Sequence, residues 1–291
     1  MENDHSRTAT AAESTEKKKN RKMQDLPLRT AVAVVLIAIL LCVIWFGGWI
    51  EAIVLGLFTA VAIYEMRNIF RKKGLSPFVL PLTVMGLSMF IILYKFGLLY
   101  TFALAVLAFL AVVIERIMNH KRTNDDLVAS LMLFVYPIIG LTSLALCGFE
   151  KDSLSRVALF CCFVGPIMAD NAAYLVGSLI GKHKLCPSIS PHKTIEGAVA
   201  GLIGGALGGV LAYFVQKLWG FDIEMWKLIL VCFIGGGIGQ FGDLLSSTFK
   251  RWAGVKDFGT IFPGHGGVMD RIDSELTAAP LVFLFFSLFV F

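Results

Sequence analysis

The sequence predicts an all-α polytopic membrane protein with about nine transmembrane helices. Hydrophobic residues make up 57% of the 291 positions and the mean hydropathy is +0.76, whereas roughly 45–50% is usual for a soluble domain. Charged residues are only 16% of the chain, and they cluster between apolar runs that are close to the roughly 20 residues needed to cross a bilayer. Backbone groups in lipid must pair internally, so these runs are expected to be helices. The runs span about 29–46, 48–66, 76–94, 97–115, 127–147, 157–181, 196–217, 227–246 and 276–291.

The distribution of basic residues predicts the orientation of these spans. Placing the N-terminus in the cytoplasm leaves 21 of the 26 Lys and Arg residues on the cytoplasmic side and five outside. This asymmetry favours an N-in, C-out topology. The predicted organisation is a disordered basic cytoplasmic tail (1–27), five N-terminal helices (28–156) and a catalytic transmembrane region (157–291). In that region, the loops 182–195 and 247–275 face the cytoplasm.

Several common site types are excluded. The six cysteines have neither a CxxC nor a Cys/His pattern, so we expect free thiols rather than a zinc site or a disulfide framework. The glycines fit neither a dinucleotide-binding fingerprint nor a P-loop. No small-residue cleavage site follows the first apolar run, which is therefore expected to be retained as a span. The basic tail before it fixes topology, or alternatively is attracted to anionic lipid.

Two predicted helices are rich in glycine. Gly197, Gly201, Gly205 and Gly209 recur every fourth residue in the run 196–217, which predicts close helix packing or a dimer seam. The glycines of the run 227–246 precede an acidic residue, so they are consistent with a packing face and equally with a kinked, cavity-lining helix.

Asp170 and Asp243 are the clearest candidates among the carboxylates within apolar runs, where ionisable groups are costly and usually functional. Asp170 is in the middle of the run 157–181, and Asp243 is near the cytoplasmic end of the run 227–246. Ser247 and Lys250 follow Asp243 at helical spacing, on the same face. In the loop 182–195, Thr194 is a predicted N-cap, and Lys193 beside a helix N-terminus is well placed for phosphate.

The stretch from Ser247 to Asp273 contains the densest set of charges and glycines after the tail. A turn-rich segment around His265, Gly266 and Gly267 separates the two halves of this stretch, and His265 is a possible phosphate donor. Hard oxygen ligands such as Asp243 and Asp270 suit Mg²⁺, and clustered cations suit phosphates. This pattern predicts phosphoryl or nucleotidyl transfer at the cytoplasmic surface, with one lipid and one soluble substrate. The cations are Lys250, Arg251, Lys256 and Arg271; the anions are Asp257, Asp270 and Asp273.

The same stretch resembles the signature of phosphatidate cytidylyltransferases, also called CDP-diacylglycerol synthases, and no position departs from that signature. The segments around Asp170 and Lys193 also resemble motifs of this family. The resemblance covers 157–291, and the first five spans match only in being apolar. The matching positions read Ser247-x-Phe249-Lys250-Arg251, four residues, then Lys256-Asp257-x-Gly259-x-x-Phe262-Pro263-x-His265-Gly266-Gly267-Val268-x-Asp270-Arg271-Ile272-Asp273.

The resemblance implies the reaction of CTP with phosphatidate to give CDP-diacylglycerol and pyrophosphate. It implies Mg²⁺, leaves room for a second cation, and implies a homodimer with no nucleic-acid partner. The implied metal ligands are Asp243 and Asp270. The implied catalytic residues are Asp170, Lys193, Lys250, Arg251 and Asp273, and the implied substrate-binding residues are Ser247, Lys256, His265, Gly266, Gly267 and Arg271.

Two other functions stay open. A CTP-dependent lipid kinase, such as a prenol kinase, would release CDP instead of pyrophosphate. A transporter would use Asp170 and the glycine-rich helices as its pathway, but this leaves the carboxylate-rich loop unexplained. The compact chain without a targeting segment predicts a bacterial inner membrane, with the active site facing the cytoplasm.

Overall fold

The computed structural model describes residues 26–149 and 153–290, and that part of the chain is built almost entirely of helices. The predicted tail lies outside it except for its last two residues. Nine helical rods are present in the described ranges. They are α2 Leu26–Phe46, α3 Gly48–Lys72, α4 Leu80–Phe96, α5 Leu98–Met118, the continuous α6 Asn124–Leu133, η1 Phe134–Ile139 and α7 Gly140–Gly148, then α8 Ser153–Ile180, α9 Ile195–Leu218, α10 Met225–Ala253 and α11 Met269–Phe289.

The all-α membrane fold is confirmed. Among the described residues, seven helical segments are long and apolar enough to cross a membrane. The apolar part of α2, Thr30–Phe46, and the whole of α4 are shorter. The count of nine spans and the orientation therefore stay predictions. The rod formed by α6, η1 and α7 widens to a π-helix around Pro137, which has no backbone N–H for the α-helical ladder.

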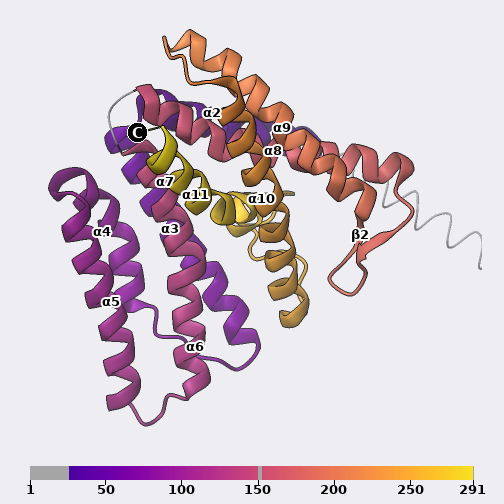
Figure 1. Cartoon of the computed structure of the whole chain (residues 1–291). Coiled ribbons are helices and arrows are strands. Elements are labelled where there is room, and N and C mark those ends of the chain that lie inside the picture. The colour runs from indigo at the N-terminus through magenta and orange to yellow at the C-terminus, as the bar shows by residue number, and fades with distance from the viewer. Residues whose placement is uncertain (1–25, 150–152, 291) are drawn as a thin grey trace, which may run out of the picture.

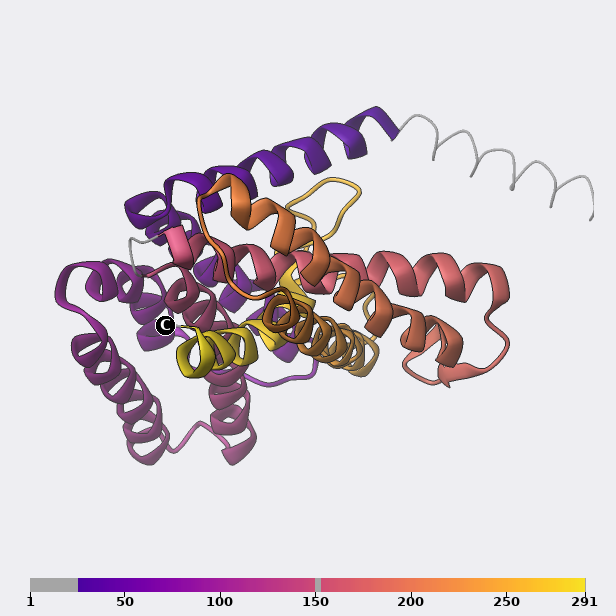
Figure 2. The same ribbon diagram turned by 45° about the horizontal axis from the view of Figure 1, so that its top comes forward.

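The helices form two groups (Figure 1). Helices α3, α4, α5 and α6 lie together on one side of the molecule, while α8 and α9 extend to the other side. Helix α8 packs mainly on α9, α10 packs on α9 and α11, and α11 also packs on α7, so that α11 links the two groups. In the turned view, α2 runs along one edge of the bundle (Figure 2).

The glycines of α9 pack against backbone, as predicted. A Cβ on Gly205 would lie 2.7 Å from the carbonyl oxygen of Cys232, and one on Gly204 would lie 2.5 Å from that of Met168. Helix α10 is continuous, and a Cβ on Gly242 would meet Thr277 of α11 at 2.2 Å. Both glycine stripes are therefore packing faces that let α8, α9, α10 and α11 approach closely.

Replacing Gly209 by Leu should destabilise the protein by about 3 kcal/mol or more, because overpacking forces backbone shifts. A Cβ there would lie 2.4 Å from the Cα of Ile229 and 2.4 Å from the carbonyl oxygen of Leu228. The measurement is the thermal midpoint of the purified variant in detergent. Gly56→Ala is the control, because its nearest neighbour would be 3.5 Å away. Equal midpoints for the two variants would contradict this packing.

The two polar loops are more regular than the sequence suggested. The loop 182–195 forms an antiparallel hairpin of β1 Lys184–Cys186 and β2 Ser190–Thr194. Thr194 caps α9 by accepting from the N–H of Gly197 at 3.1 Å, as predicted. Helix α10 continues past the apolar run until Gly254 ends it in the left-handed conformation. The loop before α11 therefore spans only 254–268.

Candidate active site

The hairpin and the loop 254–268 lie at the same end of the molecule, which we call the loop end. Arg251 near the end of α10 donates from Nε to the carbonyl oxygen of Ile189 in the hairpin at 3.3 Å. The ring of Phe70 near the end of α3 contacts Phe249 and Trp252 of α10. These contacts bring the ends of α3 and α10 and the hairpin together, although they are far apart in the sequence.

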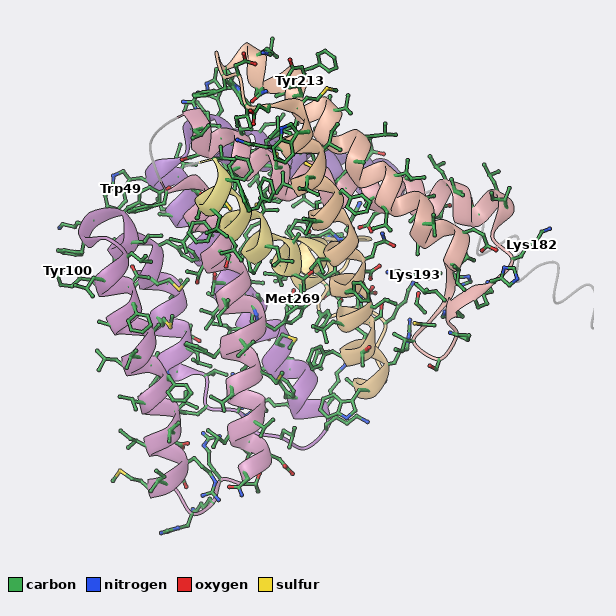
Figure 3. All side chains as sticks on the ribbon, viewed as in Figure 1. Trp49, Tyr100, Lys182, Lys193, Tyr213 and Met269 are labelled. Atoms are coloured by element: carbon green, nitrogen blue, oxygen red, sulfur yellow. The ribbon has the colours of Figure 1, made fainter. Side chains whose placement is uncertain are left out.

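A polar pocket of about 610 Å³ opens between α8, the hairpin, α9 and α10. Asp170, Lys193 and Asp243 all line this pocket. Lys193 Nζ forms an ion pair with Asp243 Oδ2 at 2.7 Å and also lies 3.5 Å from the carbonyl oxygen of Gln240. Figure 3 shows Lys193 beside the hairpin, on the side facing α10. The structure thus joins two predicted site residues that are 50 positions apart.

Three carboxylates gather where α8, α10 and α11 meet. The charge of Asp243 acts on both Asp170 and Asp273, and Asp170 and Asp273 also act on each other. Asp170 accepts from the hydroxyl of Ser274 at 3.2 Å, and Asp243 lies 3.5 Å from Ser247 Oγ. Like charges repel one another, so a cation such as the Lys193 ammonium stabilises the group.

Asp270 organises the loop 254–268. Its Oδ1 pairs with Lys250 Nζ at 2.9 Å, and its Oδ2 accepts from the backbone N–H groups of Phe258 at 2.8 Å and Gly267 at 3.0 Å. Gly266 has φ +89°, and a Cβ there would lie 2.8 Å from Asp270 Oδ2. Only glycine fits this position without strain. The side chain of Asp270 is 3% exposed, and its predicted role as a metal ligand stays a prediction.

Glu65 in α3 belongs to the site, although no motif in the sequence indicated it. Its carboxylate accepts from the backbone N–H of Val268 at 3.1 Å and of Met269 at 2.9 Å. These are the N–H groups at the start of α11, where no local side chain provides a cap. Glu65 is buried and also contacts Gly259 and Gly267 closely. It therefore holds the loop 254–268 and the first turn of α11 against the N-terminal group of helices.

An apolar pocket of about 360 Å³ lies further along α8, between α2, α3, α7 and α8. Its walls are mostly Leu, Ile, Val and Phe side chains, and its polar residues are His265, Arg271 and Glu275. The charges of Arg271 and Glu275 interact. The buried Nδ1 of His265 has no hydrogen-bond partner within the described residues. The pocket therefore combines an apolar chamber with a polar end that contains a guanidinium, an imidazole and a carboxyl group.

The predicted site residues thus fall into separate groups. Lys193, Asp243 and Asp170 face the polar pocket, whereas His265 and Arg271 face the apolar one. Gly267 belongs to the Asp270 network. Arg251 and Lys256 are exposed at the loop end, and neither lines one of these two pockets.

Asp170, Asp243 and Asp273 offer carboxylate oxygens, which are the type of ligand that Mg²⁺ prefers. In the described ranges, no group of three or more His, Cys, Asp or Glu side chains is arranged to hold a metal by itself. Magnesium usually binds through one or two carboxylates and takes its other ligands from water and substrate phosphates. The arrangement around Asp243 is compatible with that mode of binding.

The fold and the two pockets together define an integral membrane protein with a charged pocket beside an apolar one. The chain belongs to the cytidylyltransferase family, whose model matches residues 27–289. Membership of this family makes the chain an enzyme. A phosphatidate cytidylyltransferase of Staphylococcus saprophyticus is 33% identical over 264 residues, covering 88% of this chain and 97% of the relative. Relatives of the same name from Staphylococcus haemolyticus and Staphylococcus aureus are 32% and 31% identical, with the same coverage.

Proposed function

We propose that this enzyme transfers the cytidylyl group of CTP to phosphatidate and releases pyrophosphate. The observation that carries the proposal is the pair of pockets of opposite character that follow one another along one face of α8. Ile167 lines the apolar pocket, and Asp170, one turn further along α8, lines the polar pocket. This arrangement suits one lipid and one soluble substrate whose reacting groups meet along this face of α8. The reaction named by the relatives has such a pair of substrates.

The triphosphate of CTP fits the polar pocket. Lys193 lies next to the N-terminus of α9, where the helix dipole favours phosphate. Its ammonium is paired with Asp243, so a phosphate group would compete for it and leave the carboxylate available to a cation. Mg²⁺ held by Asp243 with Asp170 or Asp273 would neutralise charge that builds on the phosphates.

Phosphatidate fits the apolar pocket. Its acyl chains would lie among the side chains of α2, α3 and α7, and its phosphate would meet Arg271 and His265. A phosphomonoester with a second pKa of about 6 is already largely anionic at neutral pH. The attacking oxygen therefore needs no strong base, and the residues contribute positioning and charge neutralisation. Lys250, held by Asp270, contributes positive charge beside α11.

The proposal places the active site on the cytoplasmic side of a bacterial inner membrane. The excess of basic residues in the loops at this end supports the orientation. The proposed homodimer rests only on the family resemblance.

The test is pyrophosphate release by the purified protein in detergent micelles with CTP, phosphatidate and Mg²⁺. We expect release only when all three are present. Release of CDP with an isoprenoid alcohol would instead identify a lipid kinase, and no turnover with either acceptor would favour a transporter.

Replacing Arg271 by Ala should raise the KM for phosphatidate about tenfold, because a charge-assisted contact to the phosphate is lost. The KM for CTP should stay unchanged, since Arg271 does not line the polar pocket. Steady-state kinetics with each substrate varied in turn measures both values. Arg116→Ala is the control, because this cation lies at the end of α5 and pairs with Asn124 instead. An increase confined to the KM for CTP would contradict the assignment of the pockets.

A further inference from the structure

A second polar cluster lies away from the polar pocket, at the end of the bundle where α3 begins. Glu51 in the first turn of α3 is fully buried. Its Oε2 accepts from the hydroxyl of Tyr94 at 2.7 Å, but its Oε1 has no hydrogen-bond partner among the described residues. Figure 3 shows Trp49, two residues before Glu51, well away from Lys193. The active site proposed above does not use this carboxylate.

Glu51 lines a pocket of about 400 Å³ between α2, α3 and the start of α8, which we call the far-end pocket. Ser155 also lines it, and its buried hydroxyl likewise has no partner in the described part of the chain. Arg156 lines it too, with its guanidinium 5.9 Å from the ring centre of Trp45. The far-end pocket thus contains one carboxyl group, one guanidinium group and one hydroxyl group.

Two unpartnered polar atoms in one pocket point to a missing ligand. A buried carboxylate oxygen or hydroxyl without a hydrogen bond is costly, and such atoms in native proteins usually have a ligand or ordered water. The rest of the lining is apolar, including Val43, Ile44 and Leu159. A ligand that matches all of these features has an ammonium group, an anionic group and an apolar portion.

We infer that the far-end pocket binds a zwitterionic phospholipid with a primary ammonium in its headgroup. The ammonium would donate to Oε1 of Glu51. The phosphate would accept from Arg156 and from the hydroxyl of Ser155. The acyl chains would pass along Val43, Ile44 and Leu159. A lipid without an ammonium leaves Glu51 unpaired, and a lone metal cation leaves Arg156 unmatched.

This lipid is distinct from the proposed acceptor substrate. Phosphatidate has no ammonium group, so it cannot pair with Glu51. The far-end pocket adjoins the apolar pocket, since Val43 lines both, but the two pockets have no polar residue in common. The inference therefore does not depend on the proposed reaction, and its test measures binding instead of turnover.

The experiment is native mass spectrometry of the full-length protein, titrated with phosphatidylethanolamine or with phosphatidylglycerol of the same acyl chains. We expect the wild type to bind the ethanolamine lipid about tenfold more tightly, as one charge-assisted contact allows. Glu51→Gln keeps the acceptor for Tyr94 but removes the charge, so it should abolish this preference. Arg156→Gln should weaken the binding of both lipids.

Two controls alter charges at the same end of the bundle without lining the pocket. They are Glu224→Gln and Lys95→Gln, and both should keep the wild-type preference. Equal binding of the two lipids to the wild type would overturn the inference, as would a preference that survives in Glu51→Gln. Since a buried change can impair folding, Arg156→Gln gives a second test. Unchanged affinity for both lipids in that variant would also overturn the inference.

Discussion

Replacing Asp243 by Asn should lower kcat about 100- to 1,000-fold, the range found when a group that stabilises developing charge is removed. Asn keeps the size of the side chain and an acceptor oxygen, but it loses the charge that pairs with Lys193 and acts on Asp170 and Asp273. The side chain is 31% exposed in the polar pocket, so the thermal midpoint should change little. Pyrophosphate release under saturating CTP and phosphatidate measures the effect.

Asp222→Asn is the matched control. Asp222 lies after α9, is exposed and pairs with Lys217, away from both pockets of the active site. It should keep wild-type turnover. If Asp243→Asn also turns over within about threefold of the wild type, its charge is not needed in the rate-limiting step. The proposed role of Asp243 in holding a cation would then be wrong.

The fold was largely predictable because its main signals are local. Seven helical segments have the length and hydropathy of a span, and the glycines of α9 recur at one-turn spacing. The cap at Thr194 was predictable for the same reason, since the capped N–H belongs to Gly197, three residues further on. The predicted loop 247–275 wrongly included the last turns of α10 and the first turns of α11. Apolar runs define the expected spans, whereas polar residues such as Lys250 and Asp270 continue the two helices beyond those runs.

The pairing of the charges could not be predicted, because it depends on tertiary contacts. Helical spacing suggested that Asp243 shares a face with Lys250, yet Asp243 pairs with Lys193 of the hairpin and Lys250 pairs with Asp270 of α11. The apolar pocket was likewise invisible in the sequence. Its walls come from α2, α3, α7 and α8, and its polar end comes from the loop 254–268 and α11.

Glu65 was missed because its partners are more than 200 positions away. In the sequence it is one acidic residue within an apolar run, beside basic residues that already account for the topology. The sequence signal that could have indicated Glu65 lies with its partners at the start of α11. Val268, the residue that precedes α11, has no side chain able to cap a helix, so a cap from elsewhere in the fold was needed.

Replacing Glu65 by Ala should lower both stability and turnover. Two buried hydrogen bonds to a charged acceptor would be lost, which costs about 3 kcal/mol or more, and the first turn of α11 would lose its cap. That turn carries Asp270 and Arg271, so we expect kcat to fall about tenfold or more and the KM for phosphatidate to rise, since small displacements of positioning groups are costly. Kinetics well below the thermal midpoint measures both effects.

The conservative variant separates positioning from stability alone. Glu65→Gln keeps an acceptor oxygen for one of the two N–H groups, so its kcat should lie between those of Glu65→Ala and the wild type. Glu115→Ala removes a helical carboxylate that pairs with Arg122 in the N-terminal group, and it should leave kcat unchanged. If Glu65→Ala lowers the thermal midpoint while kcat and both KM values stay at wild-type levels, then Glu65 only stabilises the fold. In the proposed mechanism it does more, because the same two N–H groups that it binds fix where α11 starts and therefore where Arg271 meets the lipid phosphate.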